Sequence, residues 1–156
     1  ESYRWVQALH EVSELSLGSA TTVVHVGDRE CDIYEFLREA QGANARFLIR
    51  ASYDRRVESA DEVGSVQRHL GGMPPQALLE LRIPTQKRTA HLELRFSSVV
   101  LRAPQRIVRK ERVSVQCWVV NVVERTPPDG HEPLSWTLLT NVGVHSIEDA
   151  LERVTK

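Results

Sequence analysis

The sequence predicts an α/β fold that is interrupted by a β-rich antiparallel insertion. A strand, a helix and a second strand follow one another within residues 22–51. From residue 78 onward, apolar and polar residues alternate with the period of two that is typical of strands, and a strand followed by a helix returns at 136–154. The chain has 156 residues, which is long enough to form a core of its own.

The first elements are predicted from the spacing of apolar residues. Residues 4–15 form a predicted helix, because their apolar residues recur one helical turn apart. These residues are Trp5, Leu9 and Val12. The β-branched run at 22–26 predicts a short buried strand that stops at Gly27, so that Asp28 stands at its carboxyl end.

A second helix and a second strand complete a predicted β-α-β unit. Apolar residues repeat at helical spacing over 33–41, and Asp32 with Glu35 resembles a capping pair at the start of that helix. Residues 46–51 form a second strand, which we expect to run parallel to the first after a right-handed crossover. These elements make up the first part of the predicted core, residues 1–52.

The predicted insertion, residues 53–135, consists of short strands separated by turns rich in Gly and Pro. Its strand-like runs lie at 92–96, 99–101, 113–117 and 119–123. An antiparallel arrangement accounts for these closely spaced strands most simply. Residues 136–156 then form the second part of the core, in which Ser146 and Asp149 make a capping box for the last helix.

Charge is distributed unevenly along the chain. The net charge is −1, but residues 82–125 hold ten Lys or Arg against three acidic residues and carry +7. Clustered cations of this kind are typical of a surface that binds a polyanion such as nucleic acid. The alternative is a set of solvated strand faces and loops, and charge alone does not separate the two.

Several classes of protein are excluded or disfavoured by composition. The apolar runs are far shorter than the roughly 20 residues that span a bilayer, and the first five residues lack the features of a secretory signal. Cys31 and Cys117 have no metal-type spacing, so we expect free thiols in a reducing cytosol. His25 lies within the first predicted strand, where a core histidine is favoured over a metal ligand.

The strongest candidate for chemistry is the acidic cluster that follows the first strand. Ligands and ions collect beyond the carboxyl ends of strands in open α/β sheets, and a carboxylate there can bind Mg²⁺ or Mn²⁺. Asp28 is the best placed for this role, although a plain turn role stays open. For Asp32 we favour a helix N-cap over a metal ligand, and we expect Glu30 to offset the helix dipole.

A resemblance adds to this interpretation. Residues 27–34 read Gly-Asp-Arg-Glu-Cys-Asp-Ile-Tyr, which resembles the Asp-Arg-Glu-Ala-Asp motif around the second catalytic aspartate of DDE cut-and-paste transposases. The family is that of the bacterial insertion-sequence transposases, which includes the transposon five enzyme. The similarity extends through 46–50 to Pro-Leu-Ser-Trp-Thr-Leu-Leu-Thr at 133–140, and Cys31 stands where the family usually has Ala.

The resemblance implies a ribonuclease H-like core and a metal-dependent reaction on DNA. In the family, three carboxylates hold two Mg²⁺ or Mn²⁺ ions for hydrolysis and strand transfer at a phosphodiester. Asp28 corresponds to the second carboxylate. We expect the first Asp upstream of Glu1 and the Glu, within a Tyr-x2-Arg-x3-Glu-x6-Lys signature, downstream of Lys156. The 156-residue chain alone is therefore expected to be inactive.

The same resemblance assigns DNA contacts to three residues. Trp136 corresponds to the insertion-domain Trp that stacks on a flipped base at the transposon end, while a core Trp is the alternative. Arg50 matches a position near the cleaved strand, where it either grips phosphate or forms a surface ion pair. Arg29 either neutralises a phosphate or pairs with Glu30.

The resemblance also implies partners and a compartment. These are double-stranded DNA at transposon ends, a homodimer in the full-length synaptic complex, and a bacterial cytoplasm. A domesticated or degenerate transposase that binds only DNA or protein is the alternative. An aspartyl phosphatase is disfavoured, because Asp32 is better used as a cap than as the second Asp of a phosphatase motif.

Overall fold

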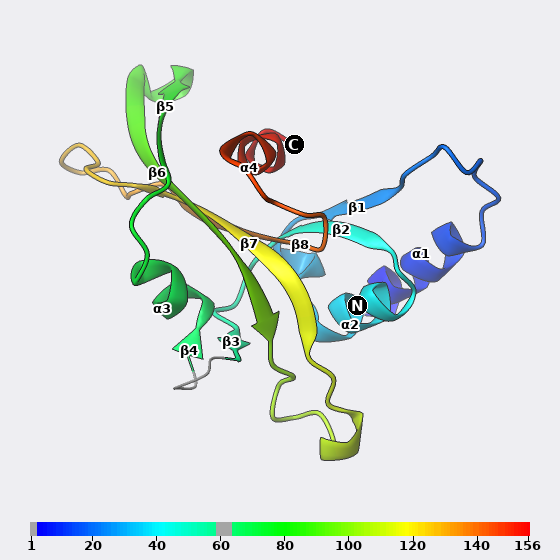
Figure 1. Cartoon of the computed structure of the whole chain (residues 1–156). Coiled ribbons are helices and arrows are strands. Elements are labelled where there is room, and N and C mark those ends of the chain that lie inside the picture. The colour runs from blue at the N-terminus through cyan, green and yellow to red at the C-terminus, as the bar shows by residue number, and fades with distance from the viewer. Residues whose placement is uncertain (1–2, 59–63) are drawn as a thin grey trace.

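The computed structural model describes residues 3–58 and 64–156. Residues 1–2 of the predicted first core segment and 59–63 of the predicted insertion lie outside the described residues. The described part is mixed α/β, with an eight-stranded mixed sheet and four α-helices (Figure 1). The α/β class predicted from the sequence is therefore confirmed.

The β-α-β unit forms as its spacing predicts. Helix α1 (Tyr3–Ser13) leads into strand β1 (Val24–Gly27) and a short 3-10 turn, η1 (Arg29–Cys31). Helix α2 (Tyr34–Gly42) and strand β2 (Arg46–Arg50) follow, and β1 and β2 pair in parallel. The parallel pairing places the carboxyl ends of both strands at the same edge of the sheet.

The prediction that the first strand is buried is wrong. Within residues 3–58 and 64–156, strand β1 pairs with β2 alone and forms one end of the sheet, and the side chain of Val26 is 62% exposed. His25 instead faces α2, where its ring meets Phe36 edge to face at 6.1 Å. One face of β1 is thus covered by the helix and the other is open, which a run of β-branched residues does not reveal.

The antiparallel pairing predicted for the middle of the chain is confirmed. Strand β5 (Ala77–Ile83) pairs with the first half of β6 (Arg88–Leu101), and β6 pairs along its length with β7 (Val115–Glu124). Strand β8 (Ser135–Thr140) then joins β7 to β2, so strands of the predicted insertion and the predicted core share one sheet. The short strands β3 (Arg56–Val57) and β4 (Gly64–Ser65) extend it beyond β6.

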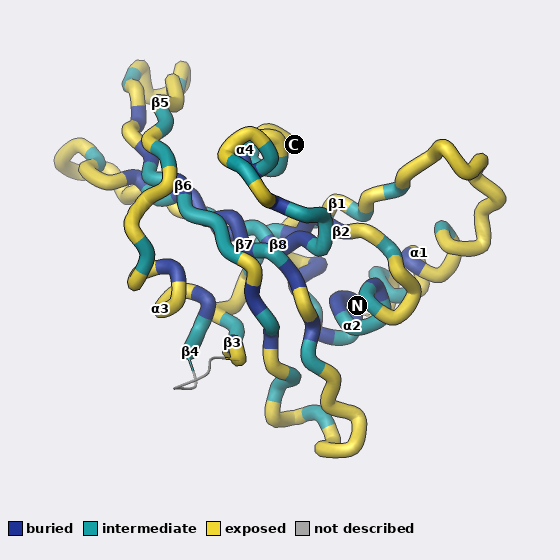
Figure 2. The backbone as a smooth tube through the Cα atoms, in the orientation of Figure 1, coloured by how far each residue is buried: buried dark blue, intermediate teal, exposed yellow. Residues whose placement is uncertain are grey.

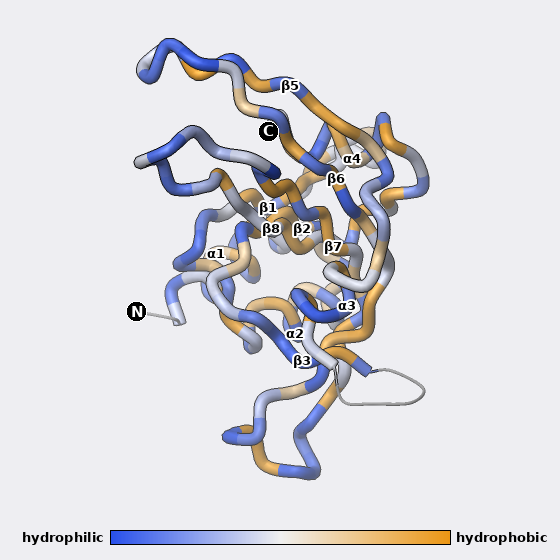
Figure 3. The backbone as a smooth tube through the Cα atoms, turned by 90° about the vertical axis from the view of Figure 1, so that its left-hand side faces the viewer, coloured by the Kyte–Doolittle hydropathy of each residue, from blue (hydrophilic) through white to orange (hydrophobic). Residues whose placement is uncertain are grey.

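Helices cover both faces of this sheet (Figure 1). Helices α1, α2 and α3 (Val66–Gly71) pack on a cluster that includes Leu37 and Phe47, while α4 (Ile147–Val154) packs on a second cluster that includes Leu94 and Val122. Buried residues follow the central strands (Figure 2), and hydrophobic residues alternate with hydrophilic ones along them (Figure 3).

The predicted capping box of the last helix is present. The Ser146 hydroxyl accepts a hydrogen bond from the Asp149 backbone N–H at 3.1 Å. The Asp149 carboxylate in turn accepts from the backbone N–H of His145 at 2.8 Å. Two otherwise unpaired donors at the start of α4 are thereby satisfied.

Both cysteines are free, as predicted, and both are buried. Burial raises the pKa of the Cys117 thiol to about 12. Burial, together with the nearby charges of Glu30 and Asp28, also raises the pKa of Cys31. The neutral thiol is the stable form of each, which is the state of a structural cysteine and not of a nucleophile.

No helix within residues 3–58 and 64–156 combines the length and the apolar composition needed to cross a membrane.

Gly27 is required by the close approach of Cys31, and this gives a first prediction. A Cβ atom at Gly27 would lie 2.4 Å from the Cys31 Sγ, whereas a Cβ at Gly42 meets nothing within 4 Å. We expect Gly27→Ala to lower the free energy of unfolding by about 1–3 kcal/mol through overpacking. Gly42→Ala is the control, with a change within about 0.5 kcal/mol. Urea denaturation measures both, and equal effects would contradict the packing argument.

Candidate functional site

Three residues singled out in the sequence meet at one cavity. This Asp28 cavity has a volume of about 410 Å³ and lies between the ends of β1, β2, β8 and α4. Its polar lining consists of Asp28, Arg50, Trp136, Arg153 and Lys156. Apolar side chains from the same four elements complete the wall.

Strand pairing explains why these residues come together. Asp28 follows β1 and Arg50 ends β2, and the two strands are parallel. Strand β8 runs antiparallel to β2, with Leu138 opposite Arg50, so the beginning of β8 lies beside the end of β2. Trp136, near the start of β8, therefore reaches the edge of the sheet that carries Asp28.

Asp28 is accessible to a ligand. Its side chain is 75% exposed, and its nearest cationic group is the Arg50 Nη1, 3.9 Å from Oδ1. It makes no side-chain capping hydrogen bond to η1. A contact of this length between exposed groups holds the carboxylate only weakly.

The two arginines of the cavity carry donors without partners. Within the described residues, the Nε atoms of Arg50 and Arg153 are the buried side-chain nitrogen or oxygen atoms that form no hydrogen bond. The Arg153 side chain is 12% exposed, and its Nη1 lies 3.0 Å from the Glu152 carboxylate. An unsatisfied buried donor costs about 1–3 kcal/mol, so an acceptor supplied by a ligand would stabilise this arrangement.

Arg153 and Lys156 were not predicted as site residues. In the sequence they stand in and just after the last turn of a helix, where a cation ordinarily offsets the helix dipole. Only the packing of α4 over the sheet brings them to the cavity. No local signal distinguishes them from cations at the end of any other helix.

Trp136 shares features of both of its predicted roles. It is partly buried, packs against the second hydrophobic cluster and also lines the Asp28 cavity. Its position within β8 holds it in place, because Val122 of β7 pairs directly with it. An anchored ring with an accessible part is suited to stacking.

Arg29 does not join the cavity. It is exposed in η1, and its backbone carbonyl accepts a hydrogen bond from the Ser52 hydroxyl at 2.7 Å. Within the described residues it forms no ion pair with Glu30, so the structural alternative for Arg29 is absent here. Its predicted contact with phosphate stays a prediction.

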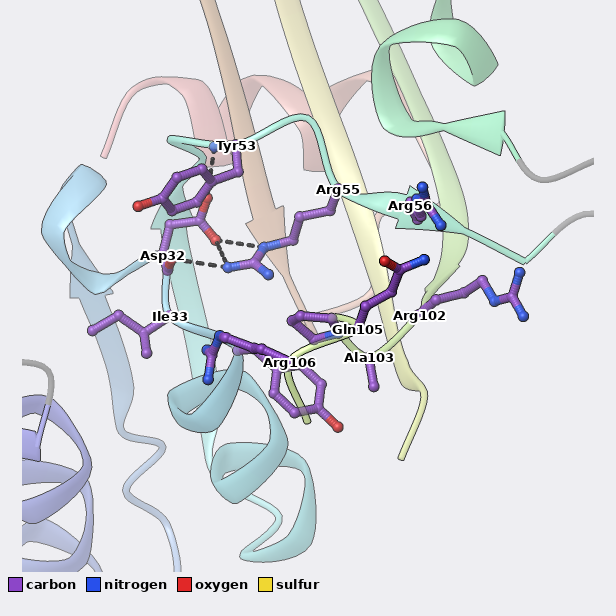
Figure 4. Close-up of a pocket in the computed structure, with 11 residues that line it drawn as sticks. Asp32, Ile33, Tyr53, Arg55, Arg56, Arg102, Ala103, Gln105 and Arg106 are labelled. Carbon is purple, nitrogen blue, oxygen red and sulfur yellow. Dashed lines mark hydrogen bonds and ion pairs between the residues drawn. The ribbon is translucent and has the colours of Figure 1, made fainter. Parts of the chain in front are cut away.

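The prediction that Asp32 caps α2 is wrong. The residue at the N-cap is Ile33, which makes no side-chain capping bond. The Asp32 carboxylate is buried and instead accepts hydrogen bonds from the backbone N–H groups of Ser52 and Tyr53, at 2.6 and 3.0 Å, and from the Arg55 Nε at 2.7 Å (Figure 4). These donors come from the loop after β2, and they outcompete the helix N–H groups because one of them carries a full charge.

Glu30 is likewise displaced from its predicted position. It lies in the first turn of η1, while the acidic residue in the first turn of α2 is Glu35. The extra 3-10 turn between β1 and α2 moves Glu30 away from the helix start. The dipole of α2 is therefore offset by Glu35 and not by Glu30.

A divalent ion has only part of a site here. Asp28 supplies a carboxylate oxygen, the donor type that Mg²⁺ and Mn²⁺ take. Within residues 3–58 and 64–156, however, no three His, Cys, Asp or Glu side chains converge to hold a metal ion. The described residues thus fit one ligand of such an ion and not a complete set.

Several arginines of the basic middle segment have partners within the protein. Arg88 is paired with Glu124, Arg95 with Glu93, and Arg106 with Glu35. Arg112 donates to the backbone carbonyls of Ile107 and Gln105. Glu93 and Glu124 are already counted in the net charge of +7, so of these three ion pairs only the one with Glu35 lowers the charge of the segment.

The sequence matches no protein-family model.

A second prediction concerns the contrast between the two aspartates. We expect Asp32→Ala to lower the free energy of unfolding by about 3–5 kcal/mol, because it leaves the Arg55 guanidinium buried without its partner. Asp28→Ala is the matched control and should change stability by less than about 0.5 kcal/mol, since Asp28 is exposed. Urea denaturation followed by circular dichroism measures both. Similar losses in the two variants would contradict the assignment of Asp32 as the structural carboxylate.

Proposed function

We propose that this chain is the central part of the catalytic core of a DDE cut-and-paste DNA transposase, with a partial ribonuclease H-like fold. The observation that supports the proposal best is the meeting of Asp28, Arg50 and Trp136 at one cavity. The resemblance selected these residues from three separate stretches of sequence, and nothing local brings them together. Their roles at a DNA end require them to be neighbours.

The edge of the sheet agrees with this proposal. Strand β1 has a free edge on the side away from β2, and Val26 is exposed there. An open, apolar edge strand is a surface on which another strand can pair. We propose that the strand bearing the first catalytic Asp of the parent protein pairs with β1, next to Asp28.

The polar residues of the Asp28 cavity have different roles at a DNA end. The guanidinium groups of Arg50 and Arg153 and the ammonium group of Lys156 attract a phosphate to the cavity. The ring of Trp136 compensates an unstacked base. Asp28 holds a carboxylate beside that phosphate, and metal ions bound with the help of further carboxylates would supply activation of the attacking oxygen.

The second candidate is a DNA-binding remnant without catalysis. It rests on the same cavity residues, Asp28, Arg50 and Trp136, without a complete metal site in the parent protein. Both candidates share the same DNA contacts and differ in the remaining carboxylates. The 156-residue chain by itself is expected to be inactive in either case.

A third prediction tests the DNA contacts with the 156-residue chain. Trp136→Ala should weaken binding to a hairpin DNA end that carries an unpaired 2-aminopurine by about 1–3 kcal/mol, because base stacking is lost. Arg50→Ala should weaken binding and reduce the salt dependence by about one phosphate contact. Fluorescence anisotropy measures affinity, and 2-aminopurine emission reports stacking. Trp5→Ala, in α1 and outside the cavity, is the matched control; an equal loss in this variant would count against the proposal.

A fourth prediction separates the enzyme from the remnant. In the full-length gene product, Asp28→Ala should abolish cutting of the DNA end in Mg²⁺ or Mn²⁺ while binding is retained, because one metal ligand is lost. Gel analysis of end-labelled DNA measures cutting. Unchanged cutting by the variant would overturn the catalytic role of Asp28. A wild-type protein that binds but never cuts would support the remnant.

A further inference from the structure

A second cavity, lined by arginines, lies on the opposite face of the sheet. It has a volume of about 520 Å³ and is formed by the start of α2, the segment after β2 and the segment after β6. We call it the Arg56 cavity, and it shares no lining residue with the Asp28 cavity. Its cations are Arg55, Arg56, Arg102 and Arg106 (Figure 4).

Two of these four guanidinium groups are already neutralised. Arg55 binds the buried carboxylate of Asp32 at 2.6 Å. Arg106 donates two hydrogen bonds to Glu35, and this contact holds the pKa of the Glu35 carboxyl below its ordinary value. These two arginines line the wall of the cavity, and its unpaired positive charge comes from Arg56 and Arg102.

Arg56 and Arg102 stand at directly opposite backbone positions of two antiparallel segments. Val57 of β3 pairs with Leu101 of β6, and the backbone N–H of Arg102 donates to the carbonyl of Arg56 at 2.9 Å. Side chains at directly opposite positions leave the same face of a sheet, and like charges placed this way destabilise the pair. The fold therefore brings two cations together at a cost.

One carboxylate, that of Glu58, lies beside this pair, because it lines a neighbouring cavity together with Arg56 and Arg102. Arg56 and Arg102 form no ion pair within residues 3–58 and 64–156. Glu58, which directly follows β3, accepts a hydrogen bond from the hydroxyl of Ser114. Two arginines at opposite backbone positions, neither in a direct ion pair, are suited to hold the oxygens of a phosphate.

An exposed aromatic ring lines the same cavity. Tyr53 is 67% exposed, and the Arg55 guanidinium carbon lies 5.8 Å from the centre of its ring. Ring and guanidinium planes are the surfaces on which nucleobases stack. The volume of the cavity also falls in the range of sites that bind small molecules.

We propose that the Arg56 cavity binds one nucleotide unit, with its phosphate between Arg56 and Arg102 and its base on the ring of Tyr53. The unit is either a free nucleotide or part of a nucleic-acid strand, since both offer the same phosphate and base. The proposal is independent of the transposase assignment, because it uses no residue of the Asp28 cavity. A nucleic-acid strand bound in the Arg56 cavity lies on the face of the sheet opposite the Asp28 cavity.

A fifth prediction tests this site with ATP and with single-stranded dT12 as probes, each titrated against the 156-residue chain by calorimetry. We expect Arg56→Gln and Arg102→Gln to weaken binding at least tenfold, and Tyr53→Ala to weaken it several-fold. Arg82→Gln, an exposed arginine on β5 outside both cavities, is the charge-matched control and should bind within twofold of wild type. Arg56, Arg102 and Tyr53 line no part of the Asp28 cavity, so a dependence of binding on these three residues separates this site from it.

The outcomes distinguish the source of the nucleotide. Binding of ATP that depends on Arg56 and Arg102 identifies a free-nucleotide site, and loss confined to dT12 identifies a site for a strand. Thermal melting checks folding: removal of one of two opposed cations should leave the melting temperature unchanged or raise it. The proposal is overturned if wild type binds neither probe, or if both Gln variants bind like wild type.

Discussion

Both candidate sites depend on the hydrogen bonds and the ion pair that the buried carboxylate of Asp32 makes. It joins the turn after β1 to the loop after β2 by accepting two backbone N–H groups and the Arg55 guanidinium. A charge buried this deeply is stable only when its partners are in place, so the two loops are held in one arrangement. Asp28 and Arg50, which line the Asp28 cavity, lie at the ends of β1 and β2, just before the linked segments. Arg55 and Arg56 follow β2 along the chain and line the Arg56 cavity.

The position of Asp28 depends further on close packing behind it. Cys31 lies against the backbone of Gly27, which leaves no room for a side chain at that position. The chain therefore turns sharply at the end of β1 and presents Asp28 outward while Cys31 stays buried. An exposed acid on a tightly held turn is suited to serve a ligand, because it loses little conformational entropy on binding.

Most of the cations that line the two cavities come from outside the basic segment, residues 82–125. Internal carboxylates neutralise several arginines of residues 82–125. The cations of the Asp28 cavity come from β2 and α4, and of the unpaired cations in the Arg56 cavity only Arg102 belongs to the basic segment. The two cavities lie on opposite faces of the sheet, so any nucleic acid that occupied both would have to pass around its edge.

The sequence by itself determined the local elements and the ends of strands where chemistry is expected. Helical and strand-like spacing depends on residues a few positions apart, so α2, β2, β6 and the capping box of α4 were predictable. Asp28 and Trp136 were identified by their own motifs. Tertiary structure alone decided the exposure of β1, the partner of Asp32 and the arrival of Arg153 and Lys156 at the cavity. These depend on which distant segments pair across the sheet, and that information is spread over the whole chain and absent from any short window of it.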